Sequence, residues 1–234
     1  MANTKSYSLG PGLSKAEKIA GFCYLPVYIA LLALGIGYLA GLLKLELTDL
    51  QLNICYFVLN SIFVWIIFHN FLLRSFRNIR FWEFVQALIL GFVLYYAGNF
   101  LFSLAMGWLG LDIGSYNDQT VMSLFEENRT VMIVCGVVLA PMVEETLVRG
   151  LVFGTIRRKS RMAAYIISIL FFAAIHVWQY IPTQGIGPVA LAALPYLPAG
   201  IALGWTYEKS DTIWAPIVLH AVINAISFGI MSVL

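Results

Sequence analysis

The chain has 234 residues, of which 61% are hydrophobic and 11% are charged, and its 14 Lys and Arg and 12 Asp and Glu give a net charge of +2. Ordinary soluble domains are about half apolar and a quarter charged, so this composition excludes both a soluble globular domain and a disordered chain. So few charges cannot form the basic surface that binds nucleic acid, and we expect no nucleic-acid partner. The composition indicates a protein of the lipid bilayer.

Seven apolar runs approach the length of about 20 residues that a helix needs to cross the hydrocarbon layer. They lie at approximately 21–43, 53–73, 82–107, 131–155, 163–181, 186–207 and 212–233. We therefore expect an all-α, polytopic transmembrane helical bundle with about seven spans. The first run is too long for the core of a signal peptide, so we expect it to remain as a membrane anchor.

The basic residues predict the orientation of these spans, because Lys and Arg accumulate in cytoplasmic loops. With the N-terminus inside, eleven of the fourteen basic residues fall on the inner side. The outer side then holds only Lys44 and Arg129, and its loops carry most of the acidic residues. We expect the N-terminus inside and the C-terminus outside. The longest outer connection, about residues 109–130, contains a candidate interfacial helix from Gln119 to Asn128.

Cysteines and glycines have structural interpretations. The three cysteines all lie in apolar runs, without a CxxC pair or a cluster with His, so we expect core residues rather than disulfides or a zinc site. Three GxxxG patterns offer small faces for close helix packing. They are Gly37 with Gly41, Gly150 with Gly154, and Gly200 with Gly204.

A few ionisable or amide side chains lie within the predicted spans, where each is costly without a partner. They include Glu144, Glu145, Arg149, His176, His220 and Asn224. Residues four apart share a face of a helix, so we expect Glu145 to pair with Arg149 as structural support. Glu144 points about 100° away and is free for other work.

The same spacing places His220 beside Asn224, and Phe172 beside His176. At about 1.5 Å per residue, Glu144, His176 and His220 reach depths at which they can meet near the middle of the membrane. Pro141 cannot donate a backbone hydrogen bond, so it can kink its helix and open space beside Glu144.

This set of side chains fits peptide hydrolysis without Ser, Cys or metal. Glu144 is our candidate general base toward a water molecule that His176 orients. His220 and Asn224 are candidate donors to the oxyanion of a tetrahedral intermediate. One alternative is a metalloprotease: HExxH is absent, but a three-ligand zinc site from Glu144, His176 and His220 stays geometrically open.

Three motifs in this part of the chain resemble a known family. They are EExxxR at Glu144 to Arg149, FxxxH at Phe172 to His176, and HxxxN at His220 to Asn224. Their order on separate apolar helices resembles the CAAX prenyl protease and bacteriocin-processing family, also called Abi, which includes the type II CAAX endopeptidases. The resemblance covers about residues 131–234.

The resemblance implies a glutamate-dependent intramembrane endopeptidase with Glu144, His176, His220 and Asn224 as catalytic residues and no cofactor or metal. Its substrates would be peptides or proteins, either prenylated CAAX-like or small and bacteriocin-like. We expect one membrane domain over 1–234, with the first three spans and an outer loop at 1–130 and the catalytic core at 131–234. We expect it in the cytoplasmic membrane of a bacterium.

Two other classes of protein can be built from the same residues. A non-proteolytic scaffold, immunity or regulatory protein would use the buried polar groups only to hold helices together. A proton-coupled transporter would use Glu and His as a relay, but it often has an inverted repeat, and the chain shows none. The intact motifs favour the peptidase.

Overall fold

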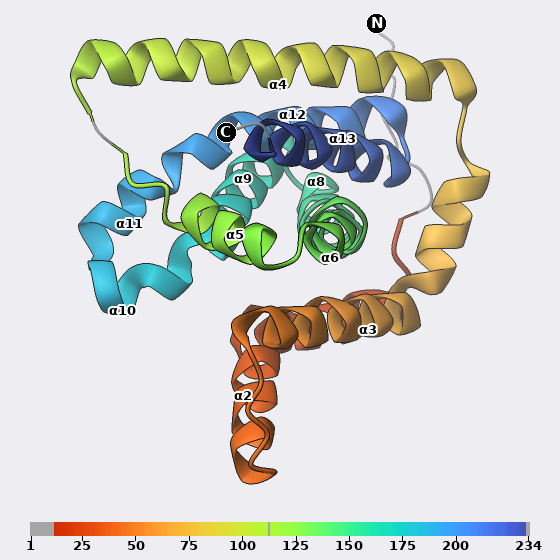
Figure 1. Cartoon of the computed structure of the whole chain (residues 1–234). Helices are drawn as coiled ribbons and strands as arrows, with labels where there is room; N and C mark the ends of the chain where they lie inside the picture. Colours follow the sequence, from red (N-terminus) through yellow and green to blue (C-terminus); the bar gives the residue numbers. More distant parts are fainter. Residues whose placement is uncertain (1–11, 112, 233–234) are drawn as a thin grey trace, which may run out of the picture.

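The computed structural model describes residues 12–111 and 113–232, and within these ranges every regular element is a helix (Figure 1). Six helical segments are long and apolar enough to cross a membrane. They are Lys15–Leu42, Asp49–Arg77, Phe81–Leu109, Arg129–Arg157, Arg161–Gln184 and Ile186–Ser210. The predicted all-α, polytopic membrane bundle is confirmed.

The seventh predicted span, 212–233, corresponds to a shorter helix. Its last residue lies outside the described residues, and the observed helix, α13, is Trp214–Met231. The apolar part of α13, Trp214–Ile230, is shorter than the six candidate spans. At 1.5 Å per residue a helix of this size is about 25 Å long, close to the hydrocarbon thickness of about 30 Å. The count of seven and the orientation stay predictions.

The N-terminal half consists of a bent first helix and two long straight ones. Its elements are α1 (Lys15–Pro26), the π-helical turn η1 (Val27–Leu31), α2 (Leu32–Leu42), α3 (Asp49–Arg77) and α4 (Phe81–Leu109). The first two spans begin earlier than their apolar runs because capping boxes start them, Ser14 with Glu17 and Thr48 with Gln51. Gly110 ends α4 with a left-handed φ of 64°, which suits glycine.

The C-terminal half is built from shorter pieces. After α5 (Tyr116–Glu127) come α6 (Arg129–Ile133), η2 (Val134–Leu139), α7 (Ala140–Glu145), η3 (Thr146–Phe153), α8 (Gly154–Arg157), α9 (Arg161–Val177), η4 (Trp178–Tyr180), α10 (Ile181–Gln184), α11 (Ile186–Ala192), η5 (Leu194–Tyr196), α12 (Leu197–Ser210) and α13. The helix α5 confirms the candidate helix in the long connection. The predicted span 186–207 is interrupted at two prolines, Pro195 in η5 and Pro198 in the first turn of α12.

The segment from α6 to α8 lies in the middle of the bundle, surrounded by α3, α9, α12 and α13, and α4 lies along α12 and α13 (Figure 1). By contrast, α2 extends away from the rest (Figure 1). A Cβ added at Gly37 or Gly41 would meet nothing within 4 Å, so this GxxxG face makes no close contact within the described chain. Gly150 and Gly200 do allow close packing, since an added Cβ would come 2.9 Å from Phe71 and 3.1 Å from Ile169, respectively.

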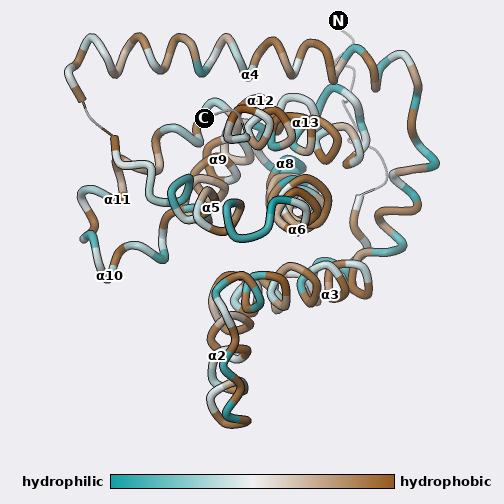
Figure 2. Tube along the Cα trace, in the orientation of Figure 1, coloured by the Kyte–Doolittle hydropathy of each residue, from teal (hydrophilic) through white to brown (hydrophobic). Residues whose placement is uncertain are grey.

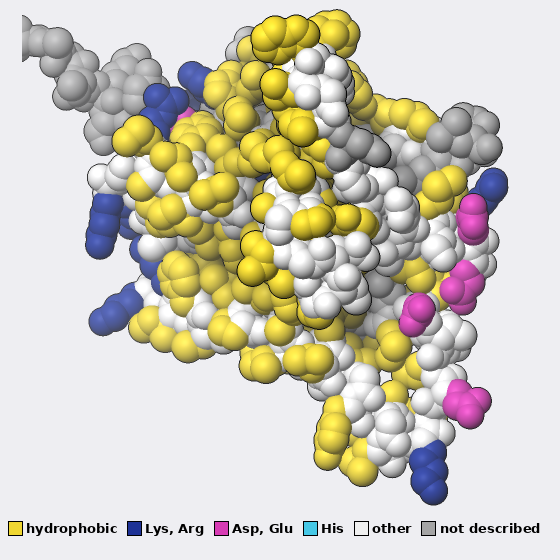
Figure 3. Space-filling model, turned by 90° about the vertical axis from the view of Figure 1, so that its left-hand side faces the viewer, with side chains coloured by type: hydrophobic (Ala, Val, Ile, Leu, Met, Phe, Trp, Pro, Cys, Tyr) yellow, Lys and Arg dark blue, Asp and Glu magenta, His cyan; other side chains and the backbone are white. Residues whose placement is uncertain are grey.

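The surface is consistent with lipid around the bundle. Apolar residues cover the outward faces of α2 and α4 (Figure 2). In Figure 3 the visible Lys and Arg gather mainly at one edge and the acidic residues at the opposite edge, with a broad apolar band between them. Charged edges on either side of an apolar band are expected of a protein that crosses a bilayer.

A group of buried hydrogen bonds ties the end of α3 to the turn between α12 and α13. The Ser75 Oγ accepts from the backbone N–H of Ile213 at 2.8 Å, and the Thr212 hydroxyl donates to the Ser75 carbonyl at 2.9 Å. The Trp214 indole N–H donates to the Leu72 carbonyl at 3.0 Å. These contacts set the starting point of α13, and with it the position of His220 one and a half turns later.

We expect Ser75→Ala to destabilise the protein by about 1–3 kcal/mol, because it leaves the buried Ile213 N–H without an acceptor. Ser61 is a matched control on the same helix, since its side chain is also buried but its hydroxyl has no partner in the described chain. Thermal unfolding in detergent measures the difference. Equal melting temperatures for Ser75→Ala and Ser61→Ala would contradict this interpretation.

Candidate active site

Two π-helical segments flank the short helix α7, which carries both glutamates of the first motif. They are η2 before α7 and η3 after it. Between them Pro141 has no N–H to donate, so the regular hydrogen-bond ladder cannot continue. In η2 the N–H of Ala140 bonds to the carbonyl of Cys135, five residues back. Such π-helical turns occur frequently at functional sites.

The widened turn leaves the Gly136 carbonyl without its backbone donor, because the residue five positions later is Pro141. The side-chain amide of Asn224 on α13 donates to this carbonyl at 2.8 Å. The sequence interpretation missed this contact, which commits one amide hydrogen of Asn224 to structure.

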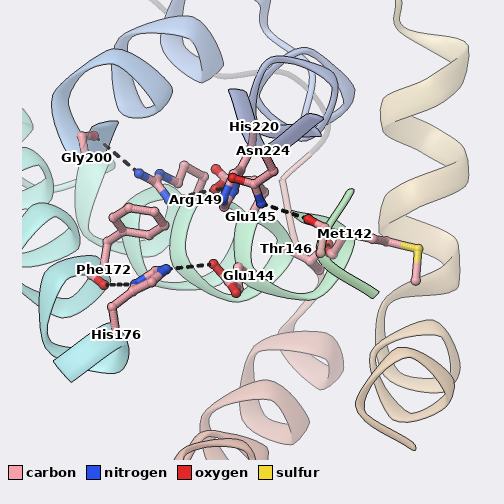
Figure 4. Close-up of polar contacts among 11 residues, drawn as sticks. Met142, Glu144, Glu145, Thr146, Arg149, Phe172, His176, Gly200, His220 and Asn224 are labelled. Atoms are coloured by element: carbon pink, nitrogen blue, oxygen red, sulfur yellow. Dashed lines mark hydrogen bonds and ion pairs between the residues drawn. The ribbon is translucent and has the colours of Figure 1, made fainter. Parts of the chain in front are cut away.

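The predicted pair of Glu145 and Arg149 forms and is entirely buried. The distance from Arg149 Nη1 to Glu145 Oε1 is 2.8 Å, and both side chains are 0% exposed. A second Arg149 nitrogen donates to the Gly200 carbonyl on α12 at 3.3 Å (Figure 4). The guanidinium also lies over the ring of Phe172, 4.3 Å from its centre. One cation thus binds groups from α7, α9 and α12.

Glu144 points away from this pair and faces His176, as its position on the helix predicts (Figure 4). Glu144 Oε2 lies 3.5 Å from His176 Nε2, and His176 Nδ1 lies 2.7 Å from the Phe172 carbonyl oxygen. A carbonyl only accepts, so Nδ1 must carry a hydrogen. In a neutral imidazole, Nε2 then carries no hydrogen and cannot donate to an ionised Glu144. Either a proton shared by the two groups or a bridging water molecule must connect Nε2 to the carboxylate. This is the local arrangement that proton transfer needs.

His220 has a different partner from the one that its motif suggested. Its Nδ1 lies 2.9 Å from Glu145 Oε1, so it donates to the carboxylate that also holds Arg149. The side chain of Phe172 lies between the two histidines, with ring centres 4.6 Å from His176 and 5.7 Å from His220. The structure therefore contains two acid–imidazole pairs, Glu144 with His176 and Glu145 with His220.

The zinc site considered from the sequence would need Glu144, His176 and His220 to converge. Within the described ranges no three His, Cys, Asp or Glu side chains come together as a metal site requires. Glu144, His176 and His220 do not converge because His220 contacts Glu145 and not Glu144.

Several residues beside the site belong to no motif, and the sequence interpretation missed them. The Tyr196 ring stacks on the His176 imidazole, 4.4 Å between centres. Asp118 on α5 lines the same cavity as Tyr196, and burial raises the pKa of Asp118 although the nearby His176 lowers it. The Glu144 charge also reaches Tyr28 and Tyr56 from the first two spans. The only sequence signal for these tyrosines is a hydroxyl group within an apolar run.

We expect Glu145→Gln to destabilise the protein by about 3–5 kcal/mol, because it leaves the buried Arg149 cation without its anion. Glu144→Gln is the matched control one residue away, since Glu144 makes no ion pair with Arg149. Unfolding of both variants in detergent tests the difference. Equal melting temperatures for Glu145→Gln and Glu144→Gln would contradict a stabilising role of the buried pair.

Residues 126–226 match the family model described as type II CAAX prenyl endopeptidase Rce1-like, a range that holds all three motifs. Neither a curated protein nor a solved structure gives a significant match to the chain. The match confirms the resemblance indicated by the motifs, and the helices agree with a multi-pass membrane protein. Over this segment the chain is similar to the Rce1-like type II CAAX prenyl endopeptidases.

Proposed function

We propose that the chain is an intramembrane endopeptidase in which Glu144 activates water for attack on a peptide bond. The observation that carries the proposal is the contact between Glu144 and a histidine whose other ring nitrogen is fixed by the Phe172 carbonyl. Both side chains keep some exposure, 13% for Glu144 and 16% for His176, and the Glu144 Oε2 that faces the imidazole is buried without a hydrogen-bond partner among the described residues, so it is open to a water molecule as acceptor. The side chains of Glu145 and Arg149, by contrast, have no exposed surface.

The geometry supports a sequence of proton transfers. Glu144 accepts a proton from a water held near His176 Nε2 while the water oxygen attacks the carbonyl carbon. His220 Nε2, when protonated, and the second amide hydrogen of Asn224 donate to the resulting oxyanion. Collapse of the intermediate breaks the C–N bond, and the proton held at Glu144 passes to the leaving amine. The step consumes one water and yields a carboxylate and an amine.

The substrate class follows from the resemblance. We propose peptides or proteins that reach the bilayer, either prenylated CAAX-like or small and bacteriocin-like, cut within a single membrane domain of a bacterial cytoplasmic membrane. The scaffold, immunity or regulatory alternative would keep the same buried pairs but cleave nothing. The proton-coupled transporter would move a solute and release no new peptide ends.

We expect Glu144→Gln to abolish cleavage while its melting temperature stays near that of the wild type, because the change keeps size and removes only the base. Mass spectrometry of membrane-proteome N- and C-termini, in cells with wild-type or Glu144→Gln protein, measures this without a known substrate. Glu126→Gln, an exposed glutamate on α5, is the control. Identical peptide ends in wild-type and Glu144→Gln cells would favour the scaffold alternative.

We also expect cleavage to need no metal, as the family resemblance implies. Purified protein should retain its turnover after exhaustive chelation and dialysis, and elemental analysis should find no stoichiometric zinc. The control is a metalloprotease treated in parallel, which should lose its activity. Loss of turnover that zinc alone restores would replace the glutamate mechanism by a metal-dependent one.

A further inference from the structure

A small notch lies between the start of α1 and the end of the segment that carries the two glutamates. Lys18 lines the notch from α1, and Arg158 lines it directly after α8. One candidate membrane span begins at Lys15 and another ends at Arg157. The notch therefore lies where two spans leave the apolar layer, at the level of the lipid headgroups.

Two cations at the notch lack the acidic partners that neighbouring cations have. Glu208 binds Arg157 at 2.6 Å and Arg161 at 2.8 Å, so these charges are already paired. No ion pair among the described residues includes Lys18 or Arg158. Both charges are therefore open to an anion from outside the chain.

The Thr155 hydroxyl of α8 lines the same notch. Its Oγ1 is buried and has no hydrogen-bond partner in the part of the chain that the structure describes. A buried hydroxyl without a partner is costly, so a missing acceptor or donor is expected there. The notch has a volume of about 10 Å³, close to the least that holds one water-sized group. It can take a single oxygen atom of a group that lies mainly outside it.

Glycines form part of the walls of the notch. Gly150 and Gly154, one of the GxxxG pairs, line it without a side chain. A Cβ at Gly12 would collide with the Arg158 guanidinium, which lies against the bare backbone at this position. The eleven residues before Gly12 contain no Asp or Glu that could neutralise the two cations.

We propose that this notch binds the phosphate of an anionic phospholipid headgroup. One phosphate oxygen enters the notch and accepts from the Thr155 hydroxyl, while Lys18 and Arg158 bind the negative charge above it. A lipid is favoured over a soluble phosphate because the notch lies at the ends of two spans, where basic residues meet headgroups. The lipid joins α1, outside the segment that matches the family model, to α8 inside it. The site does not depend on the proposed function.

Thermal unfolding of the full chain in a neutral detergent tests the ligand and its source. Phosphatidylglycerol should raise the melting temperature by about 5 °C, because a ligand that binds only the folded state stabilises it. Phosphatidylcholine at the same mole fraction should raise it by less than about half as much, because its choline cation opposes the two basic residues. A rise with inorganic phosphate as large as with phosphatidylglycerol, at constant ionic strength, would support the phosphate site and overturn the choice of a lipid. No rise with either would overturn the proposal.

Variants separate the notch from a general attraction of lipid to basic residues. Thr155→Val changes no charge, yet it should raise the phosphatidylglycerol concentration at half of the shift about fivefold. Its melting temperature without lipid should equal or exceed that of the wild type, because the unpaired hydroxyl is gone. Arg158→Gln should raise the same concentration about tenfold, whereas Lys159→Gln, at an exposed neighbour outside the notch, should stay within about twofold. Lys18→Gln and Lys15→Gln give the same comparison on α1.

Two outcomes of this series contradict the site. Equal losses in Arg158→Gln and Lys159→Gln would show that only the net charge of this edge attracts lipid. A wild-type response of Thr155→Val would show that no headgroup oxygen enters the notch. Either result would overturn the proposal, and neither depends on whether the protein cleaves a peptide.

Discussion

The buried guanidinium of Arg149 is the constraint on which the catalytic half of the molecule depends. A cation inside a membrane protein must be paired and hydrogen-bonded, since its desolvation otherwise costs several kcal/mol. Arg149 meets this need with Glu145, the Gly200 carbonyl and the Phe172 ring, and Glu145 in turn binds His220. One charge thereby fixes α7, α9, α12 and α13 relative to one another. It also fixes Phe172, whose carbonyl orients His176.

The π-helical turns explain how two adjacent glutamates serve different partners. The widened turn before α7 accommodates Pro141, and Asn224 satisfies the carbonyl of Gly136 that Pro141 leaves without a donor. This hydrogen bond holds α13 against η2, while His220 holds it against Glu145. The HxxxN motif is therefore explained in part by packing. Its histidine and its amide each bind the α6–α8 segment.

Contacts within one helix could be predicted from the sequence, and most contacts between helices could not. The pairing of Glu145 with Arg149 and the separate direction of Glu144 follow from helical periodicity alone. The motifs indicated that His176 acts beside Glu144, but the pairing of His220 with Glu145 depends on how α13 packs, and spacing carries no information on that. The partner of Asn224 depends on a π-helical turn that the periodicity of a regular helix does not contain. Tyr196 and Asp118 belong to no pattern at all, since Tyr196 reaches His176 only when η5 packs on α9, and Asp118 approaches this region only when α5 packs on α9.

The two acid–imidazole pairs differ in their exposure. Glu145 and Arg149 are fully enclosed, so their charges are permanent parts of the scaffold. Glu144 and His176 are partly exposed, and Tyr196 from η5 stacks on the imidazole. Tyr28 and Tyr56 from the first two spans pack in one apolar cluster with Val143 and Leu147, which flank Glu144, so spans outside the segment that matches the family model contribute to its surroundings. We infer that the matched core supplies the chemistry, and that α5 and the first two spans help determine how water and substrate reach it.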